Sequence, residues 1–250
     1  MDKPKTRLHI EADFSEGADI ALNRDQVHFL VHVLRLKTGD HLSLFNADGG
    51  EWLASITDHS RRRGVVHLHR QMRGPESEPG PWLAFAPIKK TRTDFIVEKA
   101  TELGVEKLIP VFTRFTASTR VNVERLTSIA REAAEQCGRL TVPEVAEPCD
   151  LADLLDNWPE GRRLFIGDET GKGVPLSTVL AGGPPEHGFL IGPEGGFSED
   201  ELVRVKTQVY ADAIDLGPRV LRAETAAIAA LAGSQALTGI ADRLSQNQRI

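Results

Sequence analysis

Two glycine-bounded segments near the C-terminus hold the residue types that could do chemistry. The first reads Ile191-Gly-Pro-Glu-Gly-Gly196 and the second Leu216-Gly-Pro-Arg-Val-Leu-Arg-Ala-Glu-Thr225. Each follows a short apolar run and precedes a helix-like stretch, which gives the order strand, glycine loop, helix. In an open α/β sheet, ligands bind at such loops beyond the carboxyl ends of the strands. The two loops are therefore predicted to line a ligand site.

The residues after the first loop argue against a phosphate ligand. The apolar run Gly188–Ile191 predicts a buried strand, and Ser198 with Glu201 three residues later predicts a helix that starts with a capping box. Glu199, Asp200 and Glu201 fill the first helical turn, where they satisfy the helix dipole and would repel a phosphate. No Gly-Lys-Ser/Thr ending is present. A cationic or phosphate-free ligand fits better, and a purely structural turn is the alternative.

The second loop carries a cluster of charges, Arg219, Arg222 and Glu224, between a predicted strand end at Ala213–Leu216 and a predicted helix. A guanidinium beside a ligand can stabilise negative charge that develops during a reaction. A solvated surface cluster is the alternative. One stripe of the helix after the loop is expected to comprise Ile228, Leu231, Ala232 and Gln235.

Three more motifs accompany the loops. They are His28-Phe-Leu-Val-His-Val-Leu-Arg35, which closes at Gly39-Asp40, then Lys99-Ala-Thr-Glu-Leu-Gly-Val105, and Glu132-Ala-Ala-Glu-Gln-Cys-Gly-Arg139. In residues and in order, the five segments resemble the RsmE-type 16S rRNA (uracil-N3)-methyltransferases of the SPOUT superfamily. A single Gly-Pro-Glu-Gly motif would be weak evidence for this family, but five matching segments in the same order over most of the chain are strong evidence.

The resemblance implies an α/β fold with two domains. Residues 1–73 would form a small PUA-like RNA-binding β-barrel, and residues 82–250 a SPOUT methyltransferase domain with a parallel sheet and a trefoil knot. The knot rests on the resemblance alone, because true knots are very rare. The resemblance also implies S-adenosylmethionine as cofactor, a homodimer, and 16S rRNA, in the assembled small subunit, as the partner. S-adenosylmethionine carries a sulfonium and no phosphate, which agrees with the acidic helix start.

The implied reaction moves a methyl group to a uracil ring nitrogen that carries an imide proton. Arg222 is the first choice to stabilise the charge that spreads onto the ring carbonyls as the proton leaves. Arg219 and Arg139 are reserves, Arg139 from a partner subunit. Glu194 or Glu224 would accept the proton, or would only orient backbone amides.

The resemblance extends to binding residues. Cofactor contacts are expected from the loop and strand-end residues Gly167, Ile191, Gly192, Gly195, Gly196, Leu216, Gly217, Val220 and Leu221. RNA contacts are expected from the basic and polar residues Arg7, His28, His32, Arg35, Lys89, Lys90, Arg92 and Arg114. Lys89 and Lys90 could equally belong to a solvated loop.

The organisation of the chain is compatible with two domains. The first seventy residues read as a β-rich unit with one helix, capped by Asn23 and Gln26, and with a hairpin around Asp48-Gly-Gly50. The helix should bury Val27, Leu30, Val31 and Leu34. Arg73-Gly-Pro-Glu-Ser-Glu-Pro-Gly-Pro81 reads as a linker. Strands and helices then alternate, starting with strand 82–87, helix 93–103 and strand 105–112, which predicts a βαβ unit.

A formal net charge of −6 is unusual for an RNA-binding enzyme, but the charge is uneven along the chain. Residues 61–142 hold 15 Lys and Arg against 9 Asp and Glu, whereas residues 143–218 hold 5 against 15. This asymmetry fits a basic face for nucleic acid and an acidic region elsewhere.

The sequence also bears on other classes of protein. Cys137 and Cys149 form no CxxC pair, and His28 and His32 lack a clustered third ligand, so no metal site is expected. No apolar run has membrane length, and we expect a cytoplasmic protein. A Rossmann enzyme would need a GxGxxG motif, which does not occur. A non-catalytic RNA-binding or ribosome-assembly protein on the same scaffold is the remaining alternative.

Overall fold

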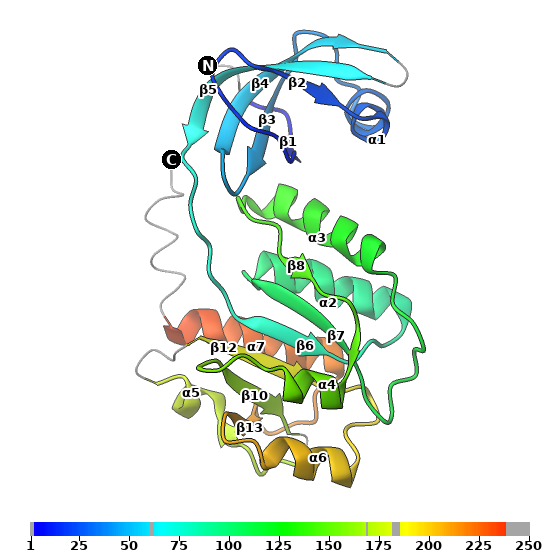
Figure 1. Cartoon of the computed structure of the whole chain (residues 1–250), viewed down its shortest axis with the longest axis vertical. Coiled ribbons are helices and arrows are strands. Elements are labelled where there is room, and N and C mark those ends of the chain that lie inside the picture. The colour runs from blue at the N-terminus through cyan, green and yellow to red at the C-terminus, as the bar shows by residue number, and fades with distance from the viewer. Residues whose placement is uncertain (1–2, 61–62, 169, 182–185, 239–250) are drawn as a thin grey trace. The chain divides into compact units, whose positions relative to one another are not determined.

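The structure, a computed structural model, describes residues 3–60, 63–168, 170–181 and 186–238. These residues group into two units (Figure 1). The first comprises the residues up to Glu78 together with Ala134–Val142, and the second comprises Pro79–Ala133 and the residues from Pro143 onward. The first boundary falls inside the stretch 73–81 that reads as a linker. The second falls within a helix, α3 (Val123–Cys137), whose last residues group with the first unit.

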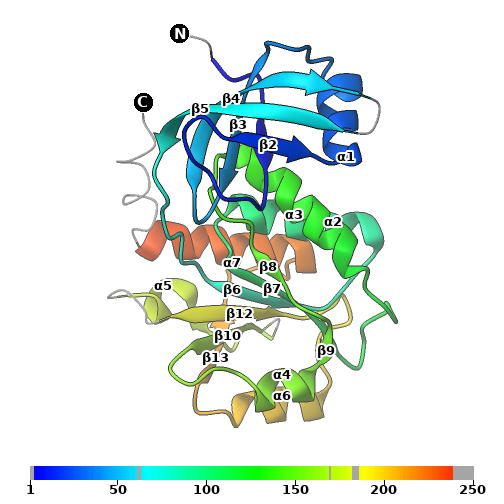
Figure 2. The same ribbon diagram turned by 45° about the horizontal axis from the view of Figure 1, so that its top comes forward.

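In the described chain, the first unit contains a five-stranded sheet with the order β1-β3-β4-β5-β2. β1 runs parallel to β3, and the other neighbours are antiparallel, with β3 and β4 forming the predicted hairpin. Figure 2 shows this sheet with helix α1 beside β2 and β5. The elements are β1 (Arg7–His9), β2 (Asp19–Leu22), α1 (Arg24–Val27), the π-helix η1 (His28–Val33), β3 (His41–Asn46), β4 (Gly50–His59) and β5 (Gly64–Arg73).

The helix of this unit begins as predicted and ends differently. Asn23 and Gln26 form the capping box. The helix then widens into a π-helix, in which the Leu34 amide donates to the carbonyl five residues back, on Phe29. The wider turn rotates the later side chains, so Leu30 is buried as predicted but Leu34 is 39% exposed. The expected burial of Leu34 was therefore wrong.

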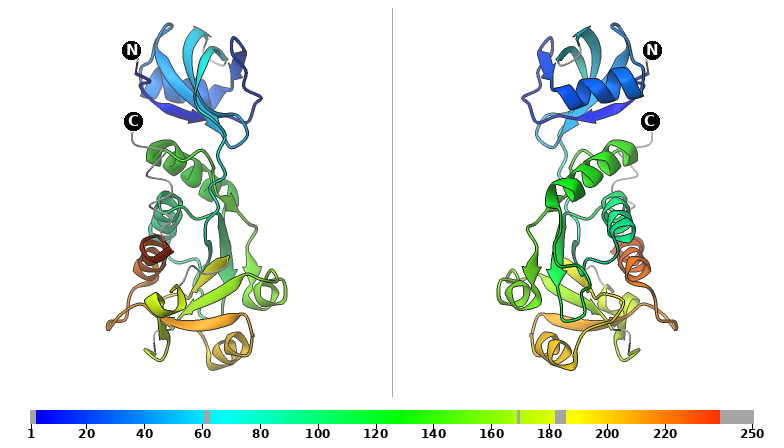
Figure 3. Two further views of the ribbon diagram at one scale, coloured as in Figure 1. Left: turned by 90° about the vertical axis from the view of Figure 1, so that its left-hand side faces the viewer. Right: turned by 90° about the vertical axis from the view of Figure 1, so that its right-hand side faces the viewer.

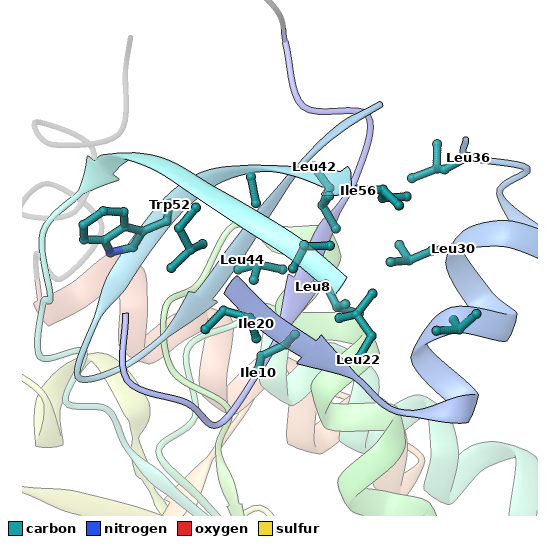
Figure 4. Close-up of a cluster of buried hydrophobic side chains, with 14 residues drawn as sticks. Leu8, Ile10, Ile20, Leu22, Leu30, Leu36, Leu42, Leu44, Trp52 and Ile56 are labelled. Atoms are coloured by element: carbon teal, nitrogen blue, oxygen red, sulfur yellow. The ribbon is translucent and has the colours of Figure 1, made fainter. Parts of the chain in front are cut away.

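The sheet and the helix enclose one hydrophobic core (Figure 4). It is built from alternate residues of the strands and from the inner side of the helix, as the period-two pattern of half-buried strands requires. Its buried members include Leu8, Ile20, Leu22, Val27, Leu30, Leu36, Leu42, Leu44, Trp52, Ile56 and Leu68.

Arg7 joins β1 to the C-terminal end of α3 within the first unit. Its Nε and Nη2 donate to the two carboxylate oxygens of Glu51 at 3.0 and 3.2 Å. Nη1 donates to the carbonyl of Ala134 at 2.9 Å, and Nη2 to that of Arg139 at 2.8 Å. Burial raises the pKa of Glu51, but the hydrogen bonds from Arg7 and Ser43 outweigh it and hold the pKa below its usual value. The structure thus gives Arg7 a structural role, and its contact with RNA stays a prediction.

The second unit has an α/β fold, as predicted, with a parallel eight-stranded sheet in the described residues. The order is β11-β13-β10-β12-β6-β7-β8, and β9 also pairs with β7. The strands are β6 (Trp82–Phe85), β7 (Lys107–Phe112), β8 (Glu144–Val145), β9 (Cys149–Asp150), β10 (Arg163–Gly167), β11 (Val174–Pro175), β12 (His187–Ile191) and β13 (Ala211–Asp215).

Helices cover both faces of this sheet. α2 and α7 pack together on one face, and α4 and α6 lie on the other (Figure 3). The helices besides α3 are α2 (Lys90–Glu102), α4 (Leu151–Asp156), α5 (Leu176–Val179), α6 (Glu199–Lys206) and α7 (Ala223–Thr238). None of the helices in the described ranges is long and apolar enough to span a membrane.

Most of the predicted elements of the second unit are present. The βαβ unit is formed by β6, α2 and β7, and Asn122 caps α3 by accepting a hydrogen bond from the Arg125 amide at 2.9 Å. Of the predicted stripe of α7, Leu231 is buried, and Ile228, Ala232 and Gln235 are half-buried. The other buried residues of the helix are Ala223, Ala227, Ala230 and Ser234, which the stripe did not include.

Replacing Arg7 by Ala is expected to lower the free energy of unfolding by about 3–5 kcal/mol, because it leaves the buried Glu51 carboxylate without its partner. Denaturant unfolding of the full chain measures this. Lys5→Ala breaks an exposed ion pair with Asp40 and is the matched control, with an expected loss of about 1 kcal/mol or less. Equal losses in the two variants would contradict the structural role of Arg7.

Candidate functional site

The candidate site lies where three neighbouring strands end. β10 pairs in parallel with both β12 and β13, so the carboxyl ends of all three meet at one edge of the sheet. The loops after these strands, with the starts of α6 and α7, enclose a cavity of about 550 Å³. A volume between roughly 300 and 1,000 Å³ is typical of small-molecule sites.

The cavity brings together the predicted cofactor residues with one exception. Those that line it are Gly167, Ile191, Gly192, Gly196, Leu216, Gly217, Val220 and Leu221. Gly195 is not among the lining residues and packs against Phe115 instead. Binding of a cofactor by these residues stays a prediction.

Glycine at two of these positions has a local cause. A Cβ on Gly192 would lie 2.7 Å from the ring of Phe197, which is too close for any side chain. Gly217 has a φ of +125°, a conformation that other residues rarely adopt. Both glycines therefore let the backbone itself form the wall of the cavity.

Glu201 fixes the start of α6 beside the cavity. Its Oε2 accepts a hydrogen bond from the Ser198 amide at 2.8 Å, and the Ser198 hydroxyl accepts one from the Glu201 amide at 3.3 Å. The predicted capping box is thus confirmed. Oε1 of Glu201 accepts a further hydrogen bond from the Arg114 amide at 2.8 Å, which connects the loop after β7 to α6. This second contact could not be predicted from the sequence, because Arg114 and Glu201 are 87 residues apart.

The predicted catalytic residues divide into three groups. Arg219 and Arg222 line the cavity with exposed side chains, and Glu194 also lines it. Glu224 is in the first turn of α7 but is not among the lining residues. Arg139 belongs to the first unit, where its buried guanidinium donates to the Thr141 hydroxyl at 2.9 Å.

Arg92 connects the first glycine loop to the start of α7. Its Nη1 donates to Glu194 at 3.2 Å, and its Nε lies 3.5 Å from Oε1 of Glu224. The other oxygen of Glu224 is buried and accepts no hydrogen bond from any residue that the structure describes. The sequence suggested that Arg92 contacts RNA phosphate. The structure places it between two carboxylates, so that contact stays a prediction.

The other predicted RNA residues lie on both units. His28 and His32 lie side by side on η1, with ring centroids 5.4 Å apart, and Arg35 follows the helix with a φ of +58°. Lys89 directly precedes α2, and Lys90 begins it. Across the described ranges, no group of three or more His, Cys, Asp or Glu is arranged to hold a metal ion.

Asp168 is a cavity residue that the sequence did not identify. It follows β10, and its buried carboxylate accepts hydrogen bonds from the Thr170 amide at 2.9 Å and from Nζ of Lys206 at 3.0 Å. Burial raises the pKa of Asp168, but these hydrogen bonds outweigh it and hold the pKa below its usual value. Only its place after a strand, within Gly167-Asp-Glu-Thr-Gly171, could have indicated a role.

Comparison with known families gives two matches. Residues 76–235 match the family described as RNA methyltransferase domain, and residues 22–68 match the family described as RNA methyltransferase PUA domain. A Rickettsia conorii protein named Ribosomal RNA small subunit methyltransferase E is 36% identical over 230 residues, which cover 90% of this chain and 93% of the relative. A Bacillus subtilis protein of the same name is 29% identical, covering 86% of this chain and 89% of the relative.

Solved structures show the same likeness. A Ribosomal RNA small subunit methyltransferase E from Neisseria gonorrhoeae, bound to S-adenosyl methionine, has a TM-score of 0.84 at 27% identity, covering 93% of this chain and 97% of that one. A Legionella pneumophila methyltransferase with bound cofactor SAM has a TM-score of 0.84 at 30% identity, covering 92% and 97%.

Asp168→Asn is expected to lower the free energy of unfolding at pH 7 by about 1–3 kcal/mol, because the charge-assisted hydrogen bonds of the buried carboxylate are weakened. The folded-state pKa lies below the ordinary value of 3.8. The stabilisation is therefore present above about pH 4 and is lost as the pH falls through the folded pKa. Thermal unfolding of both proteins between pH 3 and 7 measures this, and a constant difference over that range would refute it.

Proposed function

The chain belongs to the RNA methyltransferase family, and on that premise we propose that it transfers the methyl group of S-adenosylmethionine to N3 of a uracil in the RNA of the small ribosomal subunit. The relatives of similar length named Ribosomal RNA small subunit methyltransferase E support the class of substrate. The resemblance of the sequence motifs supports uracil N3 as the position. The single observation that carries the proposal is the cavity at the strand ends, which gathers most of the residues that the motifs single out.

The cavity suits S-adenosylmethionine in size and in chemistry. Glycines at five lining positions, Gly167, Gly171, Gly192, Gly196 and Gly217, make main-chain groups available to hold an adenosyl group, beside apolar side chains such as Ile191, Leu216 and Leu221. Glu199 and Asp200 in the first turn of α6 disfavour a phosphate ligand but not a sulfonium. When bound, S-adenosylmethionine supplies a methyl group on an excellent leaving group. Two solved relatives of high structural similarity contain it.

The side chains that line the cavity must stabilise the charge that develops on the base and allow the imide proton to leave. A ring nitrogen on the Watson–Crick edge is reachable only in an unpaired or extruded base. Arg222 and Arg219 line the cavity, where a guanidinium stabilises the negative charge on the uracil carbonyls without competing for the imide proton. Glu194 and Glu224 both form ion pairs with Arg92. These ion pairs support a role for the two carboxylates in holding the loops together, rather than a role as proton acceptor.

The resemblance supplies the finer parts of the proposal. The resemblance is the basis on which we propose the PUA-like barrel of the first unit, the trefoil knot of the C-terminal region and the homodimer. We propose on the same resemblance that the substrate is the assembled small subunit and that the protein is cytoplasmic. The division into an RNA-binding domain, residues 1–73, and a methyltransferase domain, residues 82–250, is part of the same proposal.

Arg222→Ala is expected to lower the rate of methyl transfer to unmodified small ribosomal subunits about 10²- to 10³-fold, as the loss of one charge-stabilising group does in other enzymes. The affinity for S-adenosylmethionine, measured by titration calorimetry, should change by about threefold or less. Arg204→Ala removes an arginine on α6 that pairs with Asp156 and is the control. A variant that alters only RNA affinity would favour the non-catalytic RNA-binding alternative.

Arg92→Ala is expected to weaken the binding of S-adenosylmethionine about tenfold. The change frees Glu194 and Glu224 from their common partner, and partly exposed ion pairs of this kind contribute up to roughly 1 kcal/mol each. Titration calorimetry measures the effect, and Lys89→Ala, on a nearby exposed residue, should bind the cofactor like the unmodified protein. If Arg92→Ala weakens RNA binding alone, Arg92 contacts phosphate as the sequence suggested.

A further inference from the structure

Phe115 is an exposed aromatic side chain on a tightly closed turn. The turn Thr113–Thr116 directly follows β7, and Phe115 is its third residue, with 50% of its surface exposed. The Thr113 amide donates to the Thr116 hydroxyl at 2.9 Å, and the Thr116 amide donates to the Thr113 carbonyl at 3.1 Å. Phenylalanine is usually buried. These hydrogen bonds hold the turn that presents the ring to solvent.

The same turn is attached to the wall of the candidate site. The Arg114 amide donates to Glu201 of α6 at 2.8 Å. A Cβ on Gly195 would lie 3.0 Å from the Cβ of Phe115, so the lack of a side chain there lets the turn pack against the first glycine loop. Glu194 and Gly196, on either side of Gly195, both line the cavity, whereas Phe115 does not. Phe115 therefore stands directly outside the cavity.

The loop continues from Phe115 into a second cavity, of about 750 Å³, in the same unit. Ser118 and Arg120 line it from the loop, and Lys90 lines it from the start of α2, together with the acids Glu124 and Glu147. One loop thus carries an exposed aromatic ring, with Arg114 directly before it and Arg120 five residues after it in the sequence, and this loop contacts the wall of the first cavity and lines the second. Val203 and Val209 are also exposed, but neither lines one of the two cavities.

We propose that Phe115 stacks on an unpaired nucleobase of the substrate RNA that flanks the methylated nucleotide, with Arg114 and Arg120 facing the neighbouring phosphates. An exposed aromatic ring beside cationic side chains is the arrangement with which proteins bind single-stranded RNA. The stacked base is the flanking one, because the reacting nitrogen must enter the first cavity and Phe115 lies outside it. This inference rests on the proposed function.

The test compares Phe115→Ala, Phe115→Tyr and Phe115→Leu in the full chain. Unmodified small ribosomal subunits are the probe, and both their binding and their methylation are measured. Stacking on an aromatic side chain is worth roughly 1–3 kcal/mol per base, or a factor of about 5 to 150. Phe115→Ala should raise KM for the subunit and its Kd by such a factor, with the affinity for S-adenosylmethionine unchanged. Phe115→Tyr should behave like the unmodified protein, and Phe115→Leu like the alanine variant.

Four results would overturn the assignment. Three of them are unchanged subunit binding in Phe115→Ala, an equal loss of cofactor affinity in that variant, and full recovery of subunit binding in Phe115→Leu. Dissociation of a dimer by Phe115→Ala, seen by light scattering, would assign the ring to a contact between copies. Val209→Ala, at a residue that is 91% exposed, is the control. If the unmodified protein methylates nothing, the proposed function fails, while the binding measurements still decide the role of Phe115.

Discussion

The candidate site depends on the parallel pairing of β10 with β12 and β13. In a parallel sheet, neighbouring strands end at the same edge, so segments far apart in the sequence deliver their loops to one place. An antiparallel partner would send one of these loops to the opposite edge. The positions of the glycine loops, of Arg222 and of Asp168 all follow from this one constraint.

Side chains then fix how the loops lie against one another. Glu201 binds the start of its own helix and the turn that carries Phe115, and Arg92 binds carboxylates of the first glycine loop and of α7. The second loop adds Arg219 and Arg222, which line the same cavity with exposed side chains. Glycine backbone, apolar side chains and arginines thus share the cavity wall, which suits a site that both holds a cofactor and stabilises charge.

Much of the fold and part of the site could be predicted from the sequence. The capping boxes, the βαβ unit and the glycine loops depend on local patterns, and each was found. The buried face of α7 was not, because alanine fits a buried or an exposed position equally well. The roles of Arg7 and Arg92 were missed for a different reason. Their partners lie far away in the sequence, and a basic residue gives no sign of whether its partner is a carboxylate or a phosphate.

The most direct test is to incubate the protein with S-adenosylmethionine and small ribosomal subunits that lack the modification, then locate new methyl groups in the RNA by mass spectrometry. The account predicts one new methyl group on N3 of a single uridine. It is contradicted if the protein binds S-adenosylmethionine and the subunits, yet no uridine in the RNA is methylated.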